Sequence, residues 1–238
     1  IEQYVSDYER IFYQLRILKK QGLAGAIYTQ ITDVEGEING LMTYDRKHTK
    51  IDVEQLSKLN NLLLSTPVVL KEVIPNSEKE AQMWTYTTRW EWITDGWYNE
   101  DYDVRQWEEA PGFFGFVRPG SVHNTPFTEK CSFAHTPKTE WRSSNIWLRR
   151  EVELDEIPQN PLLYIWYFTE AEVYLNGHKV LEVKGRNAPY PHCEYRKFID
   201  GTEKYLRKGK NLIAVHCKNT GGKHVQAIDL GIYDVVKD

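Results

Sequence analysis

A short stretch near the N-terminus concentrates side chains that can bind a polar ligand. Carboxylates alternate there with hydroxyl and amide groups, at Gln30, Thr32, Asp33, Glu35, Glu37 and Asn39. Such a set both donates and accepts hydrogen bonds, as the hydroxyl groups of a sugar require. The same composition is also typical of a solvated loop that caps a helix. The spacing alone leaves both interpretations open: a solvated loop, or one wall of a sugar-binding pocket.

The elements predicted around this stretch form a piece of parallel α/β structure. Apolar residues at three-to-four spacing predict an amphipathic helix over residues 4–20. The small and apolar residues of Ala24–Thr29 predict a buried parallel strand. Asp52, followed by Gln55, resembles a capping box. Leucines at helical spacing predict a second helix after it: Leu56, Leu59, Leu62 and Leu63.

The order helix, strand, long loop and helix is that expected for the last unit of a (β/α)8 barrel. In such barrels the loops that follow the strands build the active site. A lone parallel strand needs flanking strands and helices to bury it. We therefore expect the chain to be the C-terminal part of a longer protein, or to be completed by a partner. Self-association through the exposed barrel remnant is a further expectation.

The composition changes at Trp84, because all eight tryptophans lie at or after this position. The stretch 65–83, with Pro67 and Pro75, is the predicted linker between residues 1–64 and residues 84–238. From Trp84 to Trp92 aromatic residues alternate with polar ones, which predicts a strand with one aromatic face.

Further strands are predicted at regular intervals along the C-terminal part, at Ile146–Glu153, Leu162–Phe168, Ala171–Leu175, Lys179–Val183, Asn211–Cys217 and Ile228–Val235. Asn176-Gly177 between two of them indicates a hairpin, because a type I′ turn needs positive φ at both central positions. Many short strands with little helix indicate a mainly β fold, an antiparallel β-sandwich of jelly-roll type.

The string Tyr28–Arg46 (YTQITDVEGEINGLMTYDR) resembles the segment after the last barrel strand in bacterial family 2 glycoside hydrolases, the β-galactosidase/β-glucuronidase group. This resemblance implies a retaining glycosidase with one glutamate after the fourth barrel strand and one after the seventh. Both strands would precede Ile1. Retention needs two carboxyl groups about 5–5.5 Å apart, and Glu35 and Glu37 match neither catalytic motif. We therefore assign no catalytic residue, and we expect the chain alone to be inactive.

The C-terminal part resembles the galactose-binding-like jelly rolls that occur as accessory domains in family 2 enzymes and as carbohydrate-binding modules. The resemblance is carried by Asp95-Gly96-Trp97, Asp101-Tyr102-Asp103, Trp107, Gly112–Gly115 (GFFG), Trp141–Arg150 (WRSSNIWLRR), Ala171–Gly177 (AEVYLNG) and Gly209–Cys217 (GKNLIAVHC). Two alternatives to the enzyme hypothesis stay open here: a non-catalytic carbohydrate-binding module and a purely structural domain.

Tryptophans on strands are more often core residues than platforms for sugar rings. We assign this core role to Trp84, Trp90, Trp147 and Trp166. Trp97, Trp107 and Tyr190 lie near turn residues and are predicted to be more exposed. The predicted substrate-binding residues are therefore Gln30, Thr32, Asp33, Glu35, Trp97 and Trp107.

The overall composition gives no reason to expect a nucleic acid or a membrane as partner. The 238 residues carry a formal charge of −4, with a pI near 6.0, and charge runs are short and mixed. The longest fully apolar run, Leu162–Phe168, is too short to cross a bilayer. A carbohydrate substrate of the complete enzyme is the expected partner. The resemblance implies a bacterial protein, and it leaves a cytoplasmic or periplasmic location open.

Three cysteines, Cys131, Cys193 and Cys217, fit neither a disulfide framework nor a paired zinc motif. We expect reduced thiols, although one disulfide with one free thiol is an alternative. In His216-Cys217 strand alternation places the two side chains on opposite faces, so this pair cannot chelate one ion. No cofactor and no metal are predicted.

Overall fold

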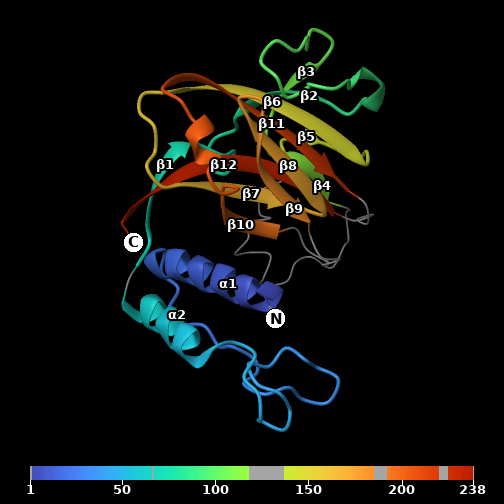
Figure 1. The fold of residues 1–238 in the computed structure, drawn as a ribbon. Helices are drawn as coiled ribbons and strands as arrows, with labels where there is room; N and C mark the ends of the chain where they lie inside the picture. Colours follow the sequence, from blue (N-terminus) through green and yellow to red (C-terminus); the bar gives the residue numbers. More distant parts are fainter. Residues whose placement is uncertain (1, 66, 118–136, 185–191, 220–224, 238) are drawn as a thin grey trace. The chain divides into compact units, whose positions relative to one another are not determined.

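The computed structural model describes residues 2–65, 67–117, 137–184, 192–219 and 225–237. The chain divides into two compact units, residues 1–70 with 235–238, and residues 71–234. The larger unit is a mainly β domain in which two sheets form a sandwich (Figure 1). The predicted fold class is therefore confirmed for the C-terminal part of the chain.

The first sheet has the strand order β10–β7–β12–β4–β5, and β1 also pairs with β12. Its strands are β1 (Val69–Ile74), β4 (Phe114–Val117), β5 (Thr139–Glu140), β7 (Pro161–Tyr167), β10 (His192–Lys197) and β12 (Val225–Lys237). The pairs β10–β7, β7–β12 and β12–β4 are antiparallel, and the pair β4–β5 is parallel. Strand β12 is thus central to this sheet.

The second sheet is antiparallel, with the order β3–β2–β6–β11–β8–β9. Its strands are β2 (Met83–Thr87), β3 (Glu108–Pro111), β6 (Asn145–Leu154), β8 (Glu170–Leu175), β9 (His178–Lys184) and β11 (Gly209–Lys218). A short 3-10 helix, η2 (Glu203–Tyr205), precedes β11. The strands predicted beyond residue 145 are therefore present, each within a few residues of its expected bounds.

Side-chain alternation explains why these strands form a sandwich. In β12, Ile228, Leu230 and Ile232 are buried in the core between the sheets. In β11, alternate residues Ile213 and Val215 join the same core. Full burial of one such side chain stabilises the fold by about 1.5–3 kcal/mol. The two sheets are held together by this shared apolar layer.

The hairpin between β8 and β9 has the predicted turn. Asn176 and Gly177 have φ angles of 50° and 86°, so both central residues are in the left-handed region that a type I′ turn requires. The Asn176 side chain also accepts a hydrogen bond from the Leu212 N–H (2.7 Å). The turn is therefore fixed to the neighbouring strand β11 as well.

A buried carboxylate ties the segment before β2 to the sandwich. Asp229 on β12 accepts hydrogen bonds from the Ser77 N–H (2.7 Å) and the Ser77 hydroxyl (3.1 Å). Arg150 donates to the Pro75 carbonyl (2.8 Å) in the same segment. Burial raises the pKa of Asp229 to about 6, and the Ser77 bonds oppose this rise only in part.

The strand predicted over Trp84–Trp92 is shorter than expected. Strand β2 ends at Thr87, and a 3-10 helix, η1 (Trp90–Trp92), follows it. As a result Trp90 is 72% exposed, and its predicted core role is wrong. Trp84, Trp147 and Trp166 are buried, as predicted. Strand β1 lies within the range 65–83 that was expected to be a linker.

The N-terminal unit contains two packed helices, α1 (Glu2–Lys20) and α2 (Val53–Ser65). Their common core consists of apolar side chains from both helices and from the intervening loop: Tyr8, Phe12, Ile51, Leu41, Leu56, Leu59 and Leu63. The Asp52 carboxylate accepts hydrogen bonds from the N–H groups of Glu54 and Gln55, both at 3.0 Å. Both predicted helices are confirmed, and Asp52 caps α2, but the Gln55 side chain donates to Glu9 Oε1 (2.7 Å) where a full capping box would direct it to Asp52.

The buried strand predicted at Ala24–Thr29 is absent. These residues have no assigned strand, and the Ile27 side chain is 95% exposed. The reason is physical: a parallel strand forms only when neighbouring strands pair with its N–H and C=O groups. No other strand lies in the described part of this unit before β1. The apolar composition is therefore present without the sheet that would bury it.

Candidate functional site

The loop between α1 and α2 is ordered by a few backbone hydrogen bonds. The Asp33 N–H donates to the Met42 carbonyl (2.9 Å), and the Met42 N–H donates to the Ile31 carbonyl (2.9 Å). The Lys50 N–H then donates to the Leu41 carbonyl (2.8 Å). Three passes of the chain are therefore connected side by side, although none is long enough to count as a strand.

Asp33 points into this loop. Its Oδ1 atom accepts hydrogen bonds from Lys50 Nζ (2.5 Å) and from the Gly40 N–H (2.9 Å), and only 9% of the residue is exposed. Lys50 Nζ also donates to the Ile38 carbonyl (2.7 Å). This geometry makes Asp33 a residue that positions the loop.

Two tyrosines form hydrogen bonds to the backbone of the same segment. The Tyr28 hydroxyl donates to the Asn39 carbonyl (2.9 Å). The Tyr4 hydroxyl lies 2.6 Å from the Tyr28 hydroxyl and 3.1 Å from the Gly40 carbonyl oxygen. Burial raises the pKa of Tyr4, so its hydroxyl keeps its proton and can donate. We call Tyr4, Tyr28, Asp33 and Lys50 the backbone clamp.

A glycine is required at position 40, where the chain lies against the backbone of Thr32 and Asp33. A Cβ atom at this position would overlap the backbone of Thr32 and Asp33. Any other residue would therefore force residues 38–40 away from Asp33 and would break the Asp33–Gly40 hydrogen bond.

Three polar side chains are brought together on the outside of the clamped loop. Gln30 Nε2 donates to Glu37 Oε2 (3.2 Å) and to Asn39 Oδ1 (3.3 Å). Glu37 and Asn39 are exposed, and Gln30 is half-buried. We call Gln30, Glu37 and Asn39 the polar triad. An amide, a carboxylate and a second amide at hydrogen-bond distance are suited to binding hydroxyl groups.

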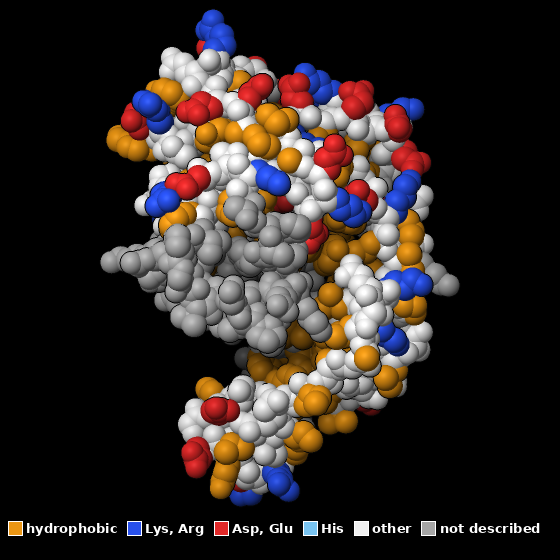
Figure 2. Space-filling model, turned by 180° about the vertical axis from the view of Figure 1, so that it is seen from behind, with side chains coloured by type: hydrophobic (Ala, Val, Ile, Leu, Met, Phe, Trp, Pro, Cys, Tyr) orange, Lys and Arg blue, Asp and Glu red, His pale blue; other side chains and the backbone are white. Residues whose placement is uncertain are grey.

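The remaining predicted loop residues differ in their surroundings. Thr32 is half-buried and forms a β-bridge with Met42. Glu35 is exposed at the tip of a turn, with a φ of 51°. Of the four predicted loop residues, the structure thus brings only Gln30 into a polar cluster at the surface. Figure 2 shows that hydrophobic side chains are exposed on this unit too, and Ile27, Ile38 and Tyr44 are each more than 70% exposed.

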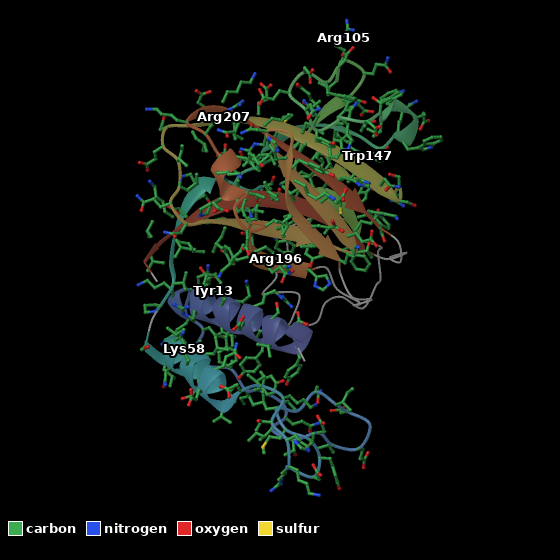
Figure 3. The ribbon with its side chains drawn as sticks, in the orientation of Figure 1. Tyr13, Lys58, Arg105, Trp147, Arg196 and Arg207 are labelled. Carbon is green, nitrogen blue, oxygen red and sulfur yellow. The ribbon has the colours of Figure 1, made fainter. Side chains whose placement is uncertain are left out.

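The exposure predicted for Trp97 and Trp107 is wrong. Only 7% of Trp97 and 8% of Trp107 is exposed, because both pack against Trp147 and Ala214 on the outer face of the second sheet. Trp147, on β6, is labelled in Figure 3. A buried indole ring has no free face for a sugar, so neither residue can stack on a ligand in this conformation.

A buried arginine, Arg149, packs against this aromatic cluster. The Arg149 guanidinium donates to the Trp97 carbonyl oxygen and lies 5.9 Å from the centre of the Tyr102 ring. Burial lowers the pKa of Arg149. The turn residues that suggested exposure of Trp97 and Trp107 belong to a loop that folds back over the sheet. Tyr190, the third aromatic residue expected at the surface, lies outside the described residues.

The His216-Cys217 pair has the predicted geometry. Cys217 is fully buried in the core between the sheets, and His216 on the other face stacks on Trp147 with ring centres 4.7 Å apart. Burial lowers the pKa of His216. Cys193 and Cys217 are not in a disulfide, and Cys131 lies outside the described residues. In the described part of the chain, no three His, Cys, Asp or Glu side chains gather as a metal site would require.

Neither helix of the described chain has the length and the apolar character needed to span a membrane.

No protein-family profile and no curated protein matches the chain. Solved structures similar to it are glycosidases of glycoside hydrolase family 2, at low identity. A family 2 member from Bacteroides cellulosilyticus shares 18% identity over 64% of this chain, with a TM-score of 0.40. β-Glucuronidase 2 from Bacteroides uniformis shares 17% over 70% (TM-score 0.42), and a Ruminococcus gnavus β-glucuronidase shares 13% over 71% (TM-score 0.41).

The chain spans about a fifth of the length of the first two structures, 20% and 18%, and 29% of the third.

Proposed function

We propose that this chain is the C-terminal part of a retaining family 2 glycoside hydrolase. In this proposal residues 1–64 contribute the last unit of the catalytic barrel, and the sandwich is an accessory domain of galactose-binding-like jelly-roll type. The main support is the Tyr28–Arg46 string, which resembles the segment after the last barrel strand of these enzymes. The loop that this string forms places the polar triad directly after the apolar stretch 24–29.

The unpaired stretch Ala24–Thr29 supports the same proposal. It has the composition of a buried strand, but its Ile27 side chain is 95% exposed. A barrel would give this stretch neighbours on both sides, and the loop after it would then lie at the active-site end of the barrel. A complete barrel would therefore account both for the lack of strands beside residues 24–29 and for the polar loop that follows them.

The chemistry proposed for the complete protein needs two carboxyl groups that this chain does not supply. One attacks the anomeric carbon while the other donates a proton to the leaving oxygen, and water then releases the sugar. Glu35 and Glu37 come from one loop and match neither catalytic motif. The role of this chain is therefore to bind the substrate and to support the barrel.

The direct test compares the chain with the protein translated from the complete reading frame. Both are incubated with 4-nitrophenyl β-galactoside, β-glucoside and β-glucuronide. We expect the complete protein to release nitrophenol with retention of configuration, which NMR of the first-formed sugar detects, and the chain to release none. Hydrolysis by the chain alone would contradict the placement of the catalytic groups. A complete protein that cleaves no glycoside would overturn the proposal.

A further inference from the structure

The polar triad leaves a donor and an acceptor for a ligand. Both hydrogens of Gln30 Nε2 are directed to Glu37 Oε2 and Asn39 Oδ1. Glu37 Oε1 and Asn39 Nδ2 form no hydrogen bond with the described residues, and both side chains are exposed. A sugar hydroxyl can donate to the carboxylate while its neighbour accepts from the amide. The triad is therefore complementary to a pair of adjacent hydroxyl groups.

The charge of the loop limits which sugar can bind there. Residues 30–43 contain Asp33, Glu35 and Glu37 but no lysine or arginine. Lys50 lies against Asp33 and balances that carboxylate, so the charges of Glu35 and Glu37 remain. The carboxylate of a uronic acid close to Glu37 would be repelled.

We propose that the polar triad binds the hydroxyl groups of a neutral sugar unit, in preference to a uronic acid, and that Asp33 and Lys50 are positioning residues for it. This inference rests on the proposed glycosidase function. The clamp controls the triad because it holds the backbone of residues 38–40: Lys50 binds the Ile38 carbonyl, Tyr28 binds the Asn39 carbonyl, and Asp33 binds the Gly40 N–H. Asn39 lies in the middle of this held segment.

The test of the triad uses the complete protein and its Glu37→Gln variant, with 4-nitrophenyl β-galactoside, β-glucoside and β-glucuronide as probes. We expect kcat/KM for the better neutral substrate to exceed that for the glucuronide at least about tenfold, and Glu37→Gln to reduce this ratio about tenfold. The matched control is Glu54→Gln, an exposed position on α2 with the same change of charge, which should keep the ratio.

Each other outcome has a defined meaning. A preference for the glucuronide, or an unchanged ratio in Glu37→Gln, would overturn the inference and leave the glycosidase function intact. Hydrolysis of none of the three probes would instead overturn the proposed function, and the inference with it.

The positioning role is tested with Asp33→Asn, Lys50→Met and the double variant in the complete protein. We expect each single change to raise KM for the neutral substrate about tenfold, with kcat within about twofold, and the double variant to equal either single variant because the pair acts as one unit. A lower kcat at unchanged KM would indicate a smaller folded fraction. That result, or additive effects in the double variant, would overturn the positioning role.

Discussion

Strand β7 of the sandwich has a hydrogen-bonded neighbour on each side, β10 and β12. Residues 24–29 of the N-terminal unit have similar apolar character but no neighbouring strand within the described part of that unit. The outcome differs accordingly: Ile165 on β7 is fully buried, whereas Ile27 is 95% exposed. An apolar run becomes a strand only where the chain also supplies its partners. The predictions below use this contrast, from the largest expected effect to the smallest.

The largest difference is expected between two isoleucines. Ile228 on β12 is 1% exposed, so Ile228→Ala should lower the free energy of unfolding by about 2–5 kcal/mol. The same change at Ile27, which is 95% exposed, should stay within about 0.5 kcal/mol. Urea denaturation of the chain measures both, followed by tryptophan fluorescence for the sandwich and by far-ultraviolet circular dichroism for the helices of the N-terminal unit, which has no tryptophan. A large loss for Ile27→Ala in the isolated chain would show that this stretch is buried in solution.

The second prediction concerns the pH dependence that Asp229 gives the sandwich. Its pKa is about 6 in the folded state against 3.8 as the ordinary value, so the folded state binds the proton more tightly. The contribution of Asp229 to stability is therefore complete below pH 4 and is lost as the pH rises through 6. The loss amounts to roughly 3 kcal/mol, because one pKa unit corresponds to about 1.4 kcal/mol.

Denaturation curves between pH 4 and pH 7 test this, with Asp229→Asn compared against the unchanged chain. The free energy of unfolding of the unchanged chain, minus that of Asp229→Asn, should decrease from pH 4 to pH 7. Asp155→Asn, at an exposed position of the same domain, is the control and should give parallel curves. Parallel curves for Asp229→Asn would mean that this carboxyl group does not titrate differently on folding.

A smaller and more local effect is expected in the N-terminal unit. Asp33→Asn removes a charged acceptor of Lys50 and Gly40, which should destabilise the loop by about 1–3 kcal/mol. Hydrogen exchange at the Gly40 amide should become faster, while the amides of β7 keep their protection. Slower or unchanged exchange at Gly40 would show that the clamp does not depend on this carboxylate.

The smallest effect is expected at an exposed aromatic residue. Trp90 is 72% exposed, so Trp90→Ala should change the free energy of unfolding by less than about 0.5 kcal/mol. Trp84, on the preceding strand, is 3% exposed, and Trp84→Ala should cost about 3–5 kcal/mol. Acrylamide quenching of tryptophan fluorescence should decrease in Trp90→Ala and remain in Trp84→Ala. Equal losses of stability at both positions would contradict the early end of β2.

The sequence predicted those parts of the fold that depend on local patterns. A continuous apolar run predicted β7, alternation predicted most of the other strands from β6 to β12, and the residue types of Asn176 and Gly177 predicted the hairpin turn, because these patterns are local properties. The end of β2 was missed because aromatic alternation continues beyond Thr87 into η1. The burial of Trp97 and Trp107 was also missed, since it depends on how their loop folds over the sheet.

The candidate site was predicted only as a polar loop. Nothing near Asp33 in the sequence indicates that Lys50, 17 residues later, would pair with its carboxylate. The contribution of Tyr4 comes from an even more distant position on α1. The division of the loop into clamp and triad therefore follows from tertiary contacts, which spacing alone does not encode.

The position of β12 has a consequence for synthesis on the ribosome. This strand lies between β7 and β4 and also pairs with β1, yet it is the last described strand to be translated. The nascent chain must therefore hold the apolar faces of β7 and β4 without their shared neighbour until residues 225–237 leave the exit tunnel. A premature stop codon before residue 225 would remove a central strand of the sheet, and the product should be a substrate for chaperones and proteases.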